Sequence, residues 1–236
     1  TVGTYGCTLG GADAADFACT ISGSTVNVAF AADPNYESPA DADTNNVYVV
    51  TVLIDDGTAD DANGATTLTI TVADANDITP VYTATSTTPT VTEGATAVDS
   101  NVAITDADSG DANICTLGGA DSGLFTCTLT GQTAYSVAFS SAPDYETPGS
   151  AGSSNEYTVT VTINDGSNDG STITYTVTVG DANDQTPVYQ AADADDAISV
   201  NENVGTGSID AGTITDADTV GTYGCTLGGA DAADFA

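Results

Sequence analysis

Two copies of one acidic nonapeptide hold the side chains of this chain that are best suited to chemistry. The first copy, DANDITPVY, is Asp74–Tyr82, and the second, DANDQTPVY, is Asp181–Tyr189. Each copy follows a strand-like run and places two carboxylates and an amide within four positions, three residues before a proline. Calcium binds six to eight oxygen ligands of this kind in a flexible geometry. The two motifs therefore predict calcium sites at two turns of the chain.

The composition offers these acidic groups no counter-charge from the protein. The 236-residue chain has 34 Asp and Glu residues, no Lys, Arg or His, and a formal net charge of -34. Nucleic acid is excluded as a partner because phosphate binding relies on Lys and Arg, and an anionic membrane surface would repel the chain. No apolar run approaches the ~20 residues of a membrane span, so we expect no membrane insertion.

Enzymatic activity is not expected from this sequence. The chain lacks His and Lys, so no nucleophile–base pair of the usual kinds is present. Paired carboxylates could hydrolyse glycosides, but the acidic pairs here belong to the motifs that predict calcium binding. We therefore expect no catalytic residues.

A long repeat organises the chain. Residues 1–18 recur unchanged as residues 219–236, and a looser repeat of half that period matches Cys7–Cys19 with Cys115–Cys127. Repeats of this kind form quasi-linear arrays; the alternative is a recent duplication within a short protein. We expect the C-terminal part of one domain at 1–80, a complete domain at 81–187, and the N-terminal part of a further copy of the first domain at 188–236.

The secondary-structure signal has a period of two residues. Apolar residues alternate with threonines in Tyr157–Asn164 and again in Thr172–Val179, which is typical of half-buried antiparallel strands. Clusters of Gly, Asp, Asn and Pro separate such runs, and no helical stripe is present. The pattern predicts an all-β fold, a Greek-key β-sandwich with about seven strands per domain.

The cysteines follow the repeat. Cys7 pairs by spacing with Cys19, and Cys115 with Cys127, while Cys225 is equivalent to Cys7. Strand alternation points both cysteines of a pair inward, so a bridge between facing strands is feasible and would contribute about 3 kcal/mol. Buried free thiols are the alternative. Bridges would place the protein in an oxidising, extracellular compartment.

Taken together, the motifs resemble cadherin repeats, and the resemblance covers the whole chain at domain spacing. The motifs occur twice in matching order. They are the DxND-x-x-P junction (Asp74–Pro80, Asp181–Pro187), a Tyr–Glu pair (Tyr36–Glu37, Tyr145–Glu146), DxD (Asp106/Asp108, Asp216/Asp218), an N-terminal glutamate (Glu93, Glu202) and Asp-Gly after a strand (Asp56–Gly57, Asp165–Gly166).

The resemblance implies about three calcium ions at each junction between successive domains, with ligands from both domains. The implied ligands of the first junction are Glu37, Asp74, Asn76, Asp77, Asp106, Asp108, Asn113 and Asp165. Those of the second are Glu93, Glu146, Asp181, Asn183, Asp184, Asp216 and Asp218. Glu202 and Asp56 have the same roles in junctions whose other ligands lie outside this chain.

The two junctions differ at one position, where Asn113 stands two residues before Cys115 and Tyr223 stands two residues before Cys225. We therefore expect the second junction to bind calcium more weakly. The alternative for every acidic residue is a solvated turn position. That alternative is preferred for Asp41, Asp43, Asp60 and Asp61.

The sequence thus predicts an extracellular fibre, structural or adhesive, made of tandem cadherin-like domains that calcium stiffens. The chain would pair with itself end to end as a continuous repeat. One alternative is the stalk of a larger adhesin whose ligand-binding domain lies elsewhere. Another is a homophilic cell-adhesion module, which the absence of Trp disfavours.

Two further surfaces are candidates for contacts. The segment Thr83–Thr92 is rich in Thr and Ser around Pro89, which is typical of O-glycosylated stalks, although threonine is also a good strand residue. In Val47–Ile54, we expect Tyr48, Val50, Val52 and Ile54 to face inward. Val47, Val49 and Leu53 would then face outward, as a lateral contact between rods or as a covered surface.

Overall fold

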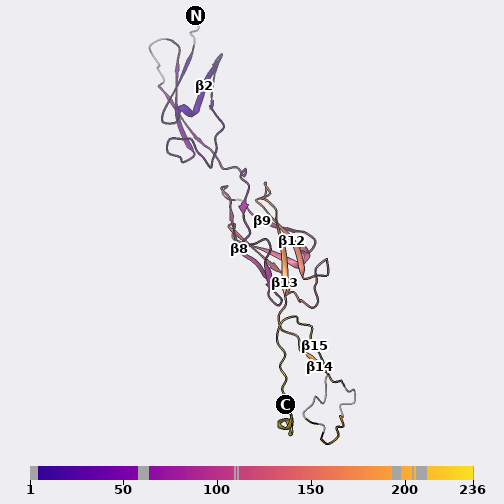
Figure 1. Ribbon diagram of the computed structural model, residues 1–236. Helices are drawn as coiled ribbons and strands as arrows, with labels where there is room; N and C mark the ends of the chain where they lie inside the picture. Colours follow the sequence, from indigo (N-terminus) through magenta and orange to yellow (C-terminus); the bar gives the residue numbers. More distant parts are fainter. Residues whose placement is uncertain are drawn as a thin grey trace. The chain divides into compact units, whose positions relative to one another are not determined.

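The computed structural model describes residues 5–57, 64–108, 110, 112–192, 198–203, 205 and 212–235. Strands and their connections make up nearly all of this part (Figure 1). Its helical content is three short 3-10 turns: Ala14–Asp16 (η1), Ser122–Leu124 (η2) and Ala232–Asp234 (η3). The predicted all-β class is confirmed.

The chain divides into two compact units. Unit 1 contains Thr1–Pro80, Thr105–Ala112 and Asp165–Asp169, and unit 2 contains Val81–Ile104, Asn113–Asn164 and Gly170–Ala236. The expected boundary at residue 80 coincides with a unit boundary, whereas the segment 188–236 belongs to unit 2. The three-part division stays a prediction.

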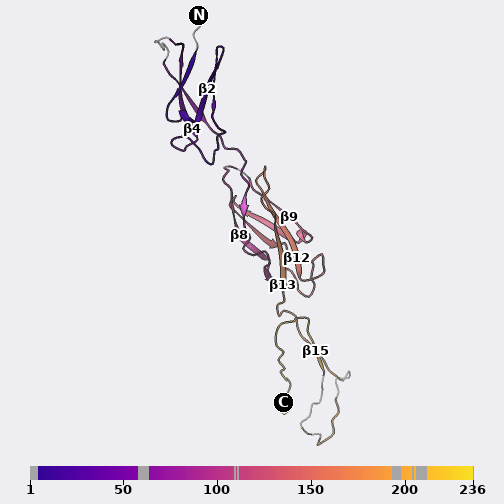
Figure 2. The ribbon, with the colours of Figure 1, turned by 45° about the horizontal axis from the view of Figure 1, so that its top comes forward.

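Unit 2 contains a sandwich of two four-stranded sheets (Figure 2). The first sheet has the order β10 (Phe125–Thr130), β11 (Ala134–Phe139), β8 (Ala97–Thr105) and β6 (Val81–Tyr82). The second has the order β7 (Thr90–Thr92), β13 (Ile173–Gly180), β12 (Glu156–Asn164) and β9 (Ile114–Gly118). Only the pairing of β7 with β13 is parallel among the described ladders.

The Thr-rich segment between β6 and β7 carries the chain from one sheet to the other. Its carbonyls at Thr87 and Pro89 accept hydrogen bonds from Thr176 (2.9 Å) and Thr178 (3.0 Å) of β13. This candidate segment for glycosylation also has a structural role, because its backbone extends the edge of the second sheet.

A polar network lies inside the sandwich. The Tyr175 hydroxyl donates to Asp99 Oδ2 (3.0 Å) and lies 3.1 Å from the Tyr135 hydroxyl. The Thr85 amide also donates to Asp99 Oδ2, at 2.9 Å. Burial raises the pKa of both tyrosines. The Asp99 carboxylate is therefore satisfied despite being 6% exposed, as a buried polar group must be.

Alternation of side chains along the strands builds the core of unit 2. In β12, Tyr157, Val159, Val161 and Ile163 all face inward and are at most 2% exposed. Phe125 and Phe139 stack at 4.4 Å, and Tyr157 meets the Phe139 ring edge-on at 5.1 Å. Apolar burial of this kind contributes about 25 cal/mol per Å², so this core dominates the stability of unit 2.

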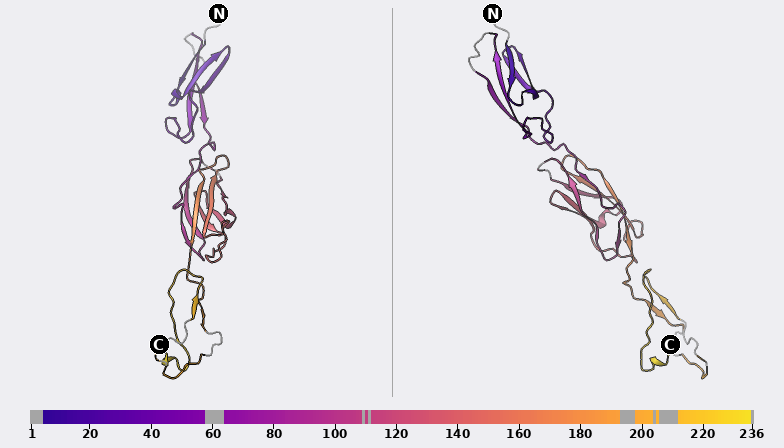
Figure 3. Two further views of the ribbon diagram at one scale, coloured as in Figure 1. Left: turned by 45° about the vertical axis from the view of Figure 1, so that its right-hand side comes forward. Right: turned by 60° about the vertical axis from the view of Figure 1, so that its left-hand side comes forward.

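Unit 1 repeats five of these strands (Figure 3). One sheet has the order β1 (Gly6–Gly10), β4 (Val47–Asp55) and β5 (Thr66–Thr71), and a separate ladder joins β2 (Phe17–Ser22) to β3 (Thr25–Phe30). Phe17 and Phe30 stack at 4.6 Å as their counterparts do in unit 2. The inward orientation expected for Tyr48 and Val50 is confirmed, with 1% and 0% exposed.

The inward face of β4 is not buried along its whole length. Ile54, which the alternation places on the inward face, is 37% exposed at this end of the strand. The reason is that the strand pair β2–β3 has no further neighbour among the described residues. Val49, on the outward face, is 39% exposed.

A disulfide joins the two sheets in each copy. Cys7 on β1 bonds to Cys19 on β2, and Cys115 on β9 bonds to Cys127 on β10, with Cα atoms 6.1 and 6.2 Å apart. These are the pairs that the spacing predicts. Cys225 is exposed and has no disulfide.

The LGGAD motif places one buried acid in each copy. Gly11 has φ 99°, and a Cβ there would lie 2.8 Å from the Val49 carbonyl, so only glycine fits this close approach. Two residues later, the Asp13 carboxylate accepts from the amides of Ala42 (2.8 Å) and Val49 (2.7 Å). Asp121 accepts in the same way in unit 2. These two acids are structural.

Asp41 corrects the expectation of a solvated turn. It is 2% exposed, and its carboxylate accepts from the amides of Asn45 (2.8 Å) and Asn46 (3.3 Å). Burial opposes ionisation, but these hydrogen bonds prevail and lower the pKa of Asp41. Asp43 is exposed as expected, and Asp60 and Asp61 lie outside the described residues.

The C-terminal part of unit 2 lies outside its sandwich. Here β14 (Val188–Gln190) pairs with β15 (Thr213–Thr215) in an isolated antiparallel ladder. Among the described residues there is no helix with the length and apolar character needed to span a bilayer.

Candidate metal sites

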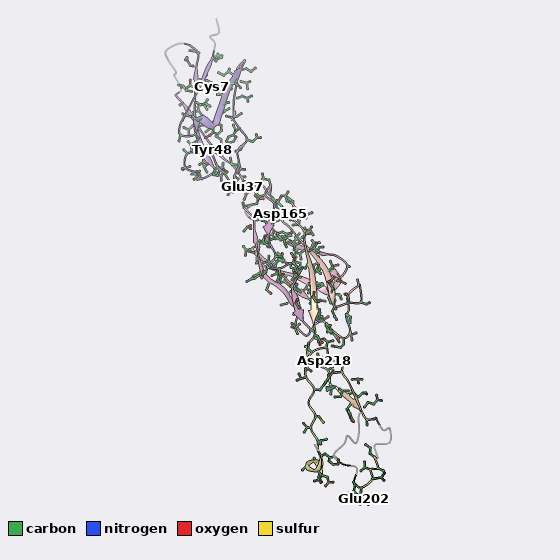
Figure 4. The ribbon with its side chains drawn as sticks, viewed as in Figure 1. Cys7, Glu37, Tyr48, Asp165, Glu202 and Asp218 are labelled. Carbon is green, nitrogen blue, oxygen red and sulfur yellow. A yellow bond between two sulfur atoms is a disulfide. The ribbon has the colours of Figure 1, made fainter. Side chains whose placement is uncertain are left out.

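Three carboxylates meet in unit 1. Glu37, Asp74 and Asp108 each offer an oxygen atom within 4.8 Å of the others. Asp74 follows β5, Asp108 follows β8, and Glu37 lies in the loop between β3 and β4. The cluster therefore gathers residues from both sides of Pro80 in the sequence. We call it the first cluster; Figure 4 labels its Glu37.

Backbone hydrogen bonds orient the DxD motif of the first cluster. The amide of Ile78 donates to Asp108 Oδ2 at 2.8 Å, and the amide of Asp108 donates to Asp106 Oδ1 at 3.3 Å. Each bond uses one oxygen of its carboxylate. The other two, Asp108 Oδ1 and Asp106 Oδ2, are buried and have no hydrogen-bond donor among the described residues.

Asp165 supplies a further oxygen in unit 1. Its Oδ1 accepts from the amides of Ser167 (2.8 Å) and Asn168 (2.6 Å), and its carbonyl accepts from Asn76 Nδ2 (3.1 Å). Burial opposes ionisation of this carboxyl, but the hydrogen bonds prevail and lower its pKa. Asp165 is thus held as a carboxylate while 2% exposed, and its buried Oδ2 lacks a donor in the described part of the chain.

Unit 2 contains two sets of three acidic residues, and Glu146 belongs to both sets. Glu93, Asp144 and Glu146 form one group, and Glu146, Asp184 and Asp218 form the other, again with oxygens within 4.8 Å. We call the five residues together the second cluster. Its Asp218 is hydrogen-bonded as Asp108 is, because the Gln185 amide donates to Asp218 Oδ2 at 2.8 Å.

Glu93 is the most constrained member of the second cluster. The amide of Tyr145 donates to its Oε2 and the amide of Ala182 to its Oε1, both at 2.7 Å. These bonds fix the carboxylate, which is 7% exposed, between the Tyr–Glu loop and the DAND turn. Asp181 is fixed from the other side, because Thr219 donates to its Oδ2 through both the amide and the hydroxyl.

Repulsion from neighbouring carboxylates contributes to the raised pKa values of Glu37 and Glu146. For Glu37, a backbone hydrogen bond acts to lower the pKa, but desolvation and the nearby Asp77 and Asp108 prevail and raise it. For Glu146, desolvation and then the charges of Glu93, Asp181 and Asp218 raise the pKa. Like charges this close resist ionising together.

The oxygen set fits calcium. Besides the atoms named above, Glu146 Oε1 and Oε2, Asp181 Oδ1 and Asp218 Oδ1 are buried and lack a donor among the described residues. Buried carboxylate oxygens need a partner, and the sequence contains no Lys, Arg or His to supply one. Hard carboxylate and amide oxygens match calcium rather than a soft transition metal. Bound calcium would supply the missing positive charge.

The other predicted ligands are placed as follows. Asn76 bonds to Asp165 and Asn168, Asp216 Oδ1 accepts from the Asp218 amide at 3.2 Å, and Asp77, Asn183 and Asp184 are exposed. Asn113 is 7% exposed in unit 2, with its Nδ2 donating to the Gln132 carbonyl (2.8 Å) and its Oδ1 lacking a described donor. Asp56 and Glu202 are exposed, and Figure 4 shows Glu202 apart from Asp218.

Asp144 was missed by the sequence reasoning. It precedes the Tyr–Glu pair in PDYETP, whereas Asn35 stands there in PNYESP, so the shared Tyr–Glu pattern concealed it. Each side chain has a local role, since Asp144 Oδ1 accepts from the Thr147 amide and Asn35 Oδ1 from the Ser38 amide. A comparison of the two loops residue by residue would have found the extra carboxylate.

Solved structures with the same fold are cadherin domains. Protocadherin gammaB7 EC3-6, described as a cis-dimer structure, matches with a TM-score of 0.60 and 24% identity over 92% of this chain and 49% of that one. Human CDH23 EC21-23 matches with a TM-score of 0.52 and 25% identity over 88% and 67%. Protocadherin Gamma C5 EC1-3 matches with a TM-score of 0.56 and 19% identity, over 91% of this chain and 67% of that one.

These likenesses rest on structure. No family model and no curated protein matches the sequence. The chain spans about half the length of the protocadherin gammaB7 fragment. The likeness of this all-β chain to those structures leads to one identification: the chain is built from cadherin-like β-sandwich domains.

Proposed function

We propose that this protein is a calcium-stiffened segment of an extracellular array of cadherin-like domains with a structural or adhesive role. One observation carries the proposal. Equivalent acidic clusters in the two units hold buried carboxylate oxygens that have no donor among the described residues, in a chain with no basic side chain. Calcium is the cation that fits such a set of oxygens.

The residues of each cluster come from both sides of a DAND turn. In the first, Glu37 and Asp74 precede Pro80, and Asp108 follows it. Without a cation, these charges repel one another. Sharing a cation would convert that repulsion into a clamp between the segments before and after the turn. The same reasoning applies to Glu146 and Asp218 around Pro187, and about three ions per junction remains our proposal.

The extracellular location is supported by the two disulfides, since such bonds persist in oxidising compartments. The fold neighbours include structures described as extracellular cadherin domains. The fibre itself, end-to-end continuity of the repeat, lateral contact through Val47, Val49 and Leu53, and O-glycans on Thr83–Thr92 belong to the proposal.

Calorimetric titration of the chelator-stripped protein with CaCl₂ tests the site directly. We expect binding at both clusters and a calcium-dependent rise in the thermal unfolding temperature, because a ligand of the folded state stabilises it. The double variant Asp108→Asn/Asp218→Asn should lose most of both effects. It keeps an acceptor for the amides of Ile78 and Gln185, so the loops should retain their shape.

The matched control is Asp33→Asn/Glu156→Gln, which removes the same charge from two exposed residues outside the clusters. It should bind calcium as the parent does. Equal binding by both double variants would contradict the cluster assignment. Small-angle scattering measures stiffness separately. With calcium, we expect greater molecular lengths and a narrower distribution of those lengths than with chelator. An unchanged distribution would overturn the clamp.

The adhesin-stalk reading differs from a purely structural fibre in what lies beyond this segment. A distinct ligand-binding domain in the same polypeptide would favour the stalk. A homophilic adhesion module is the third reading. The protocadherin gammaB7 structure is described as a cis-dimer, and calcium-dependent clustering of beads coated with this chain would favour that reading here.

A further inference from the structure

The turn between β10 and β11 bonds to both ends of the segment that carries the DxD motif of unit 1. That segment runs from the end of β8 to the start of β9. The Thr133 carbonyl accepts from the amide of Ile104 at 2.8 Å. Gln132 Oε1 accepts from the Asn113 amide at 2.6 Å, and the Gln132 carbonyl accepts from Asn113 Nδ2 at 2.8 Å. Two consecutive turn residues therefore hold the segment where it begins and where it ends.

The two ends of this segment lie in different sheets of the sandwich. Ile104 is on β8 of the first sheet, and Asn113 directly precedes β9 of the second (Figure 2). Ile104 stands two residues before Asp106 and is 5% exposed. The turn and both ends belong to unit 2. A segment fixed at both ends has less conformational freedom to lose when its side chains gather around an ion.

The same turn orients the side chain of Asn113, an expected ligand of the first junction. Asn113 donates to Gln132 through its backbone amide and through its side-chain amide. Its side chain therefore cannot rotate without breaking one of these bonds. The remaining polar atom, Oδ1, is buried and has no donor among the described residues. A buried amide oxygen needs a partner, and calcium accepts oxygens of this kind.

Unit 1 differs at both of these positions. Its turn between β2 and β3 has two residues, whereas the turn between β10 and β11 has three, although the strand pairs that flank the two turns correspond. The shorter turn is Gly23–Ser24 and the longer one is Gly131–Thr133. Tyr5 stands in unit 1 where Asn113 stands in unit 2. The chain thus has Gln132 and Asn113 together in one copy and neither in the other, as expected for two residues that act as a pair.

Stability of the hairpin does not account for Gln132. The side chain is exposed, and β11 is already paired with β10 on one side and with β8 on the other. An exposed hydrogen bond adds little to such a structure. Unit 1 also closes the equivalent hairpin with the shorter turn. The bonds from Gln132 are therefore not needed to form the hairpin.

We propose that Gln132 and Thr133 are positioning residues for calcium at the first cluster. Neither residue touches the ion. They act through Asn113 and Ile104, which they hold in place before calcium arrives, so that the segment with Asp106 and Asp108 loses less freedom on binding. The role rests on the proposed function, and it adds a determinant of affinity that lies outside the acidic motifs. Residues that orient metal ligands in this way typically change affinity by about 10- to 100-fold when they are replaced.

Calorimetric titration with CaCl₂ tests the role in two backgrounds. In Asp218→Asn, which removes a carboxylate of the second cluster, the titration reports the first cluster. Gln132→Ala should there weaken binding about tenfold. Thr128→Ala, at an exposed position of the same hairpin, is the control and should bind as its background does. In Asp108→Asn, where the second cluster is read, Gln132→Ala should change nothing. A similar loss in both backgrounds would refute a role specific to the first cluster.

A conservative variant distinguishes position from charge. Gln132→Glu keeps an acceptor for the Asn113 amide and should restore the affinity that Gln132→Ala loses. Glutamate also adds a negative charge, which attracts calcium by itself. The double variant Gln132→Ala/Thr128→Glu adds that charge to the hairpin without the acceptor, and it should bind as weakly as Gln132→Ala alone. Recovery in the double variant equal to that of Gln132→Glu would assign the effect to charge and reject positioning.

Hydrogen exchange followed by NMR gives a readout that does not depend on calcium. In chelator, the amides of Ile104 and Asn113 should be protected in the parent, because protection reports the local opening of these bonds. Gln132→Ala should speed exchange at Asn113 and leave Ile104 unchanged. Replacing Gly131–Thr133 by the Gly-Ser turn of unit 1 should speed both and weaken calcium binding further. Rapid exchange of the Asn113 amide in the calcium-free parent would show that the turn does not hold this end before binding.

The outcome for the parent separates this role from the proposed function. Calcium binding by the parent with an unchanged affinity in Gln132→Ala would reject the positioning role and leave the calcium-stiffened array intact. A parent that binds no calcium would reject the proposed function, and the positioning role with it. Gln132→Ala replaces one exposed side chain, so the test does not depend on the folding of the variant with the shortened turn.

Discussion

Unit 1 and the sandwich of unit 2 contain the same five strands, yet they differ in burial. The Tyr48 and Tyr157 hydroxyls accept from a loop amide at 3.1 and 3.0 Å, and both rings meet a stacked phenylalanine pair edge-on. With this shared centre included, fifteen buried apolar residues form the core of unit 2 and three form that of unit 1 among the described residues. Local repeats therefore reproduce strand pairing and register, while a full core needs both complete sheets.

The two acidic clusters show a second, smaller difference. The second cluster contains Glu93, Asp144 and Glu146, whereas the Asn35 amide stands in unit 1 where Asp144 stands in unit 2. The expectation of weaker calcium binding at the second junction rests on Tyr223 in place of Asn113. The extra carboxylate acts in the opposite direction, so the ranking of the two sites becomes an experimental question.

The largest expected effect comes from the shared tyrosine. Tyr157→Ala should lower the free energy of unfolding of unit 2 by about 3–5 kcal/mol, because it leaves a cavity in a dense core. Tyr48→Ala should cost less, since the smaller core of unit 1 can collapse around the gap. Denaturant titration followed by tyrosine fluorescence measures both, and equal losses would contradict the difference in core packing.

The disulfides should give the next effect. Replacing Cys115 and Cys127 by Ser should cost about 2–4 kcal/mol, and the same change at Cys7 and Cys19 should cost a similar amount. The two loops have the same sequence separation of 12 residues, so unfolded-state entropy predicts equality. A much greater loss in unit 1 would mean that its bridge substitutes for missing core contacts.

The sequence predicted what depends on local pattern. Period-two alternation predicted β12 and β13, and the spacing of Cys115 and Cys127 predicted their disulfide. Both features depend on residues that lie close together in the sequence. It could not show that Asp41 is buried, since that depends on the loop that folds over it. Nor could it show that Ile54 is exposed, since that depends on which strands cover it. Asp144 was missed because the motif that the two loops share is the Tyr–Glu pair, and the residue before that pair differs between them.

A reciprocal exchange should sharpen the comparison of the clusters. Asp144→Asn should weaken calcium binding at the second cluster about tenfold, or about 1.4 kcal/mol, and Asn35→Asp should strengthen the first by a similar factor. Both changes preserve an acceptor for the local amide of Thr147 or Ser38. Calorimetric titration of each variant against the parent measures the shift; unchanged affinities would remove Asp144 from the site.

The smallest effect should be a pH dependence confined to the calcium-free protein. The pKa values of Glu37 and Glu146 are raised above 4.5 in the folded state. The folded state then binds protons more tightly than the unfolded chain does, so this stability is fully present below pH 4.5 and is lost as the pH rises through the raised values. In chelator, the unfolding temperature should therefore fall from pH 4.5 upward.

The double variant Glu37→Gln/Glu146→Gln should flatten this slope, while the control Glu156→Gln should keep it, because Glu156 is exposed and outside both clusters. Comparing the double variant with the control also cancels the effect of general charge repulsion on stability, because both derive from a chain with a formal net charge of -34. With calcium present the slope should reverse, since protons then compete with the ion for the same oxygens. A slope of one sign in both conditions would show that the glutamates do not face the bound ion.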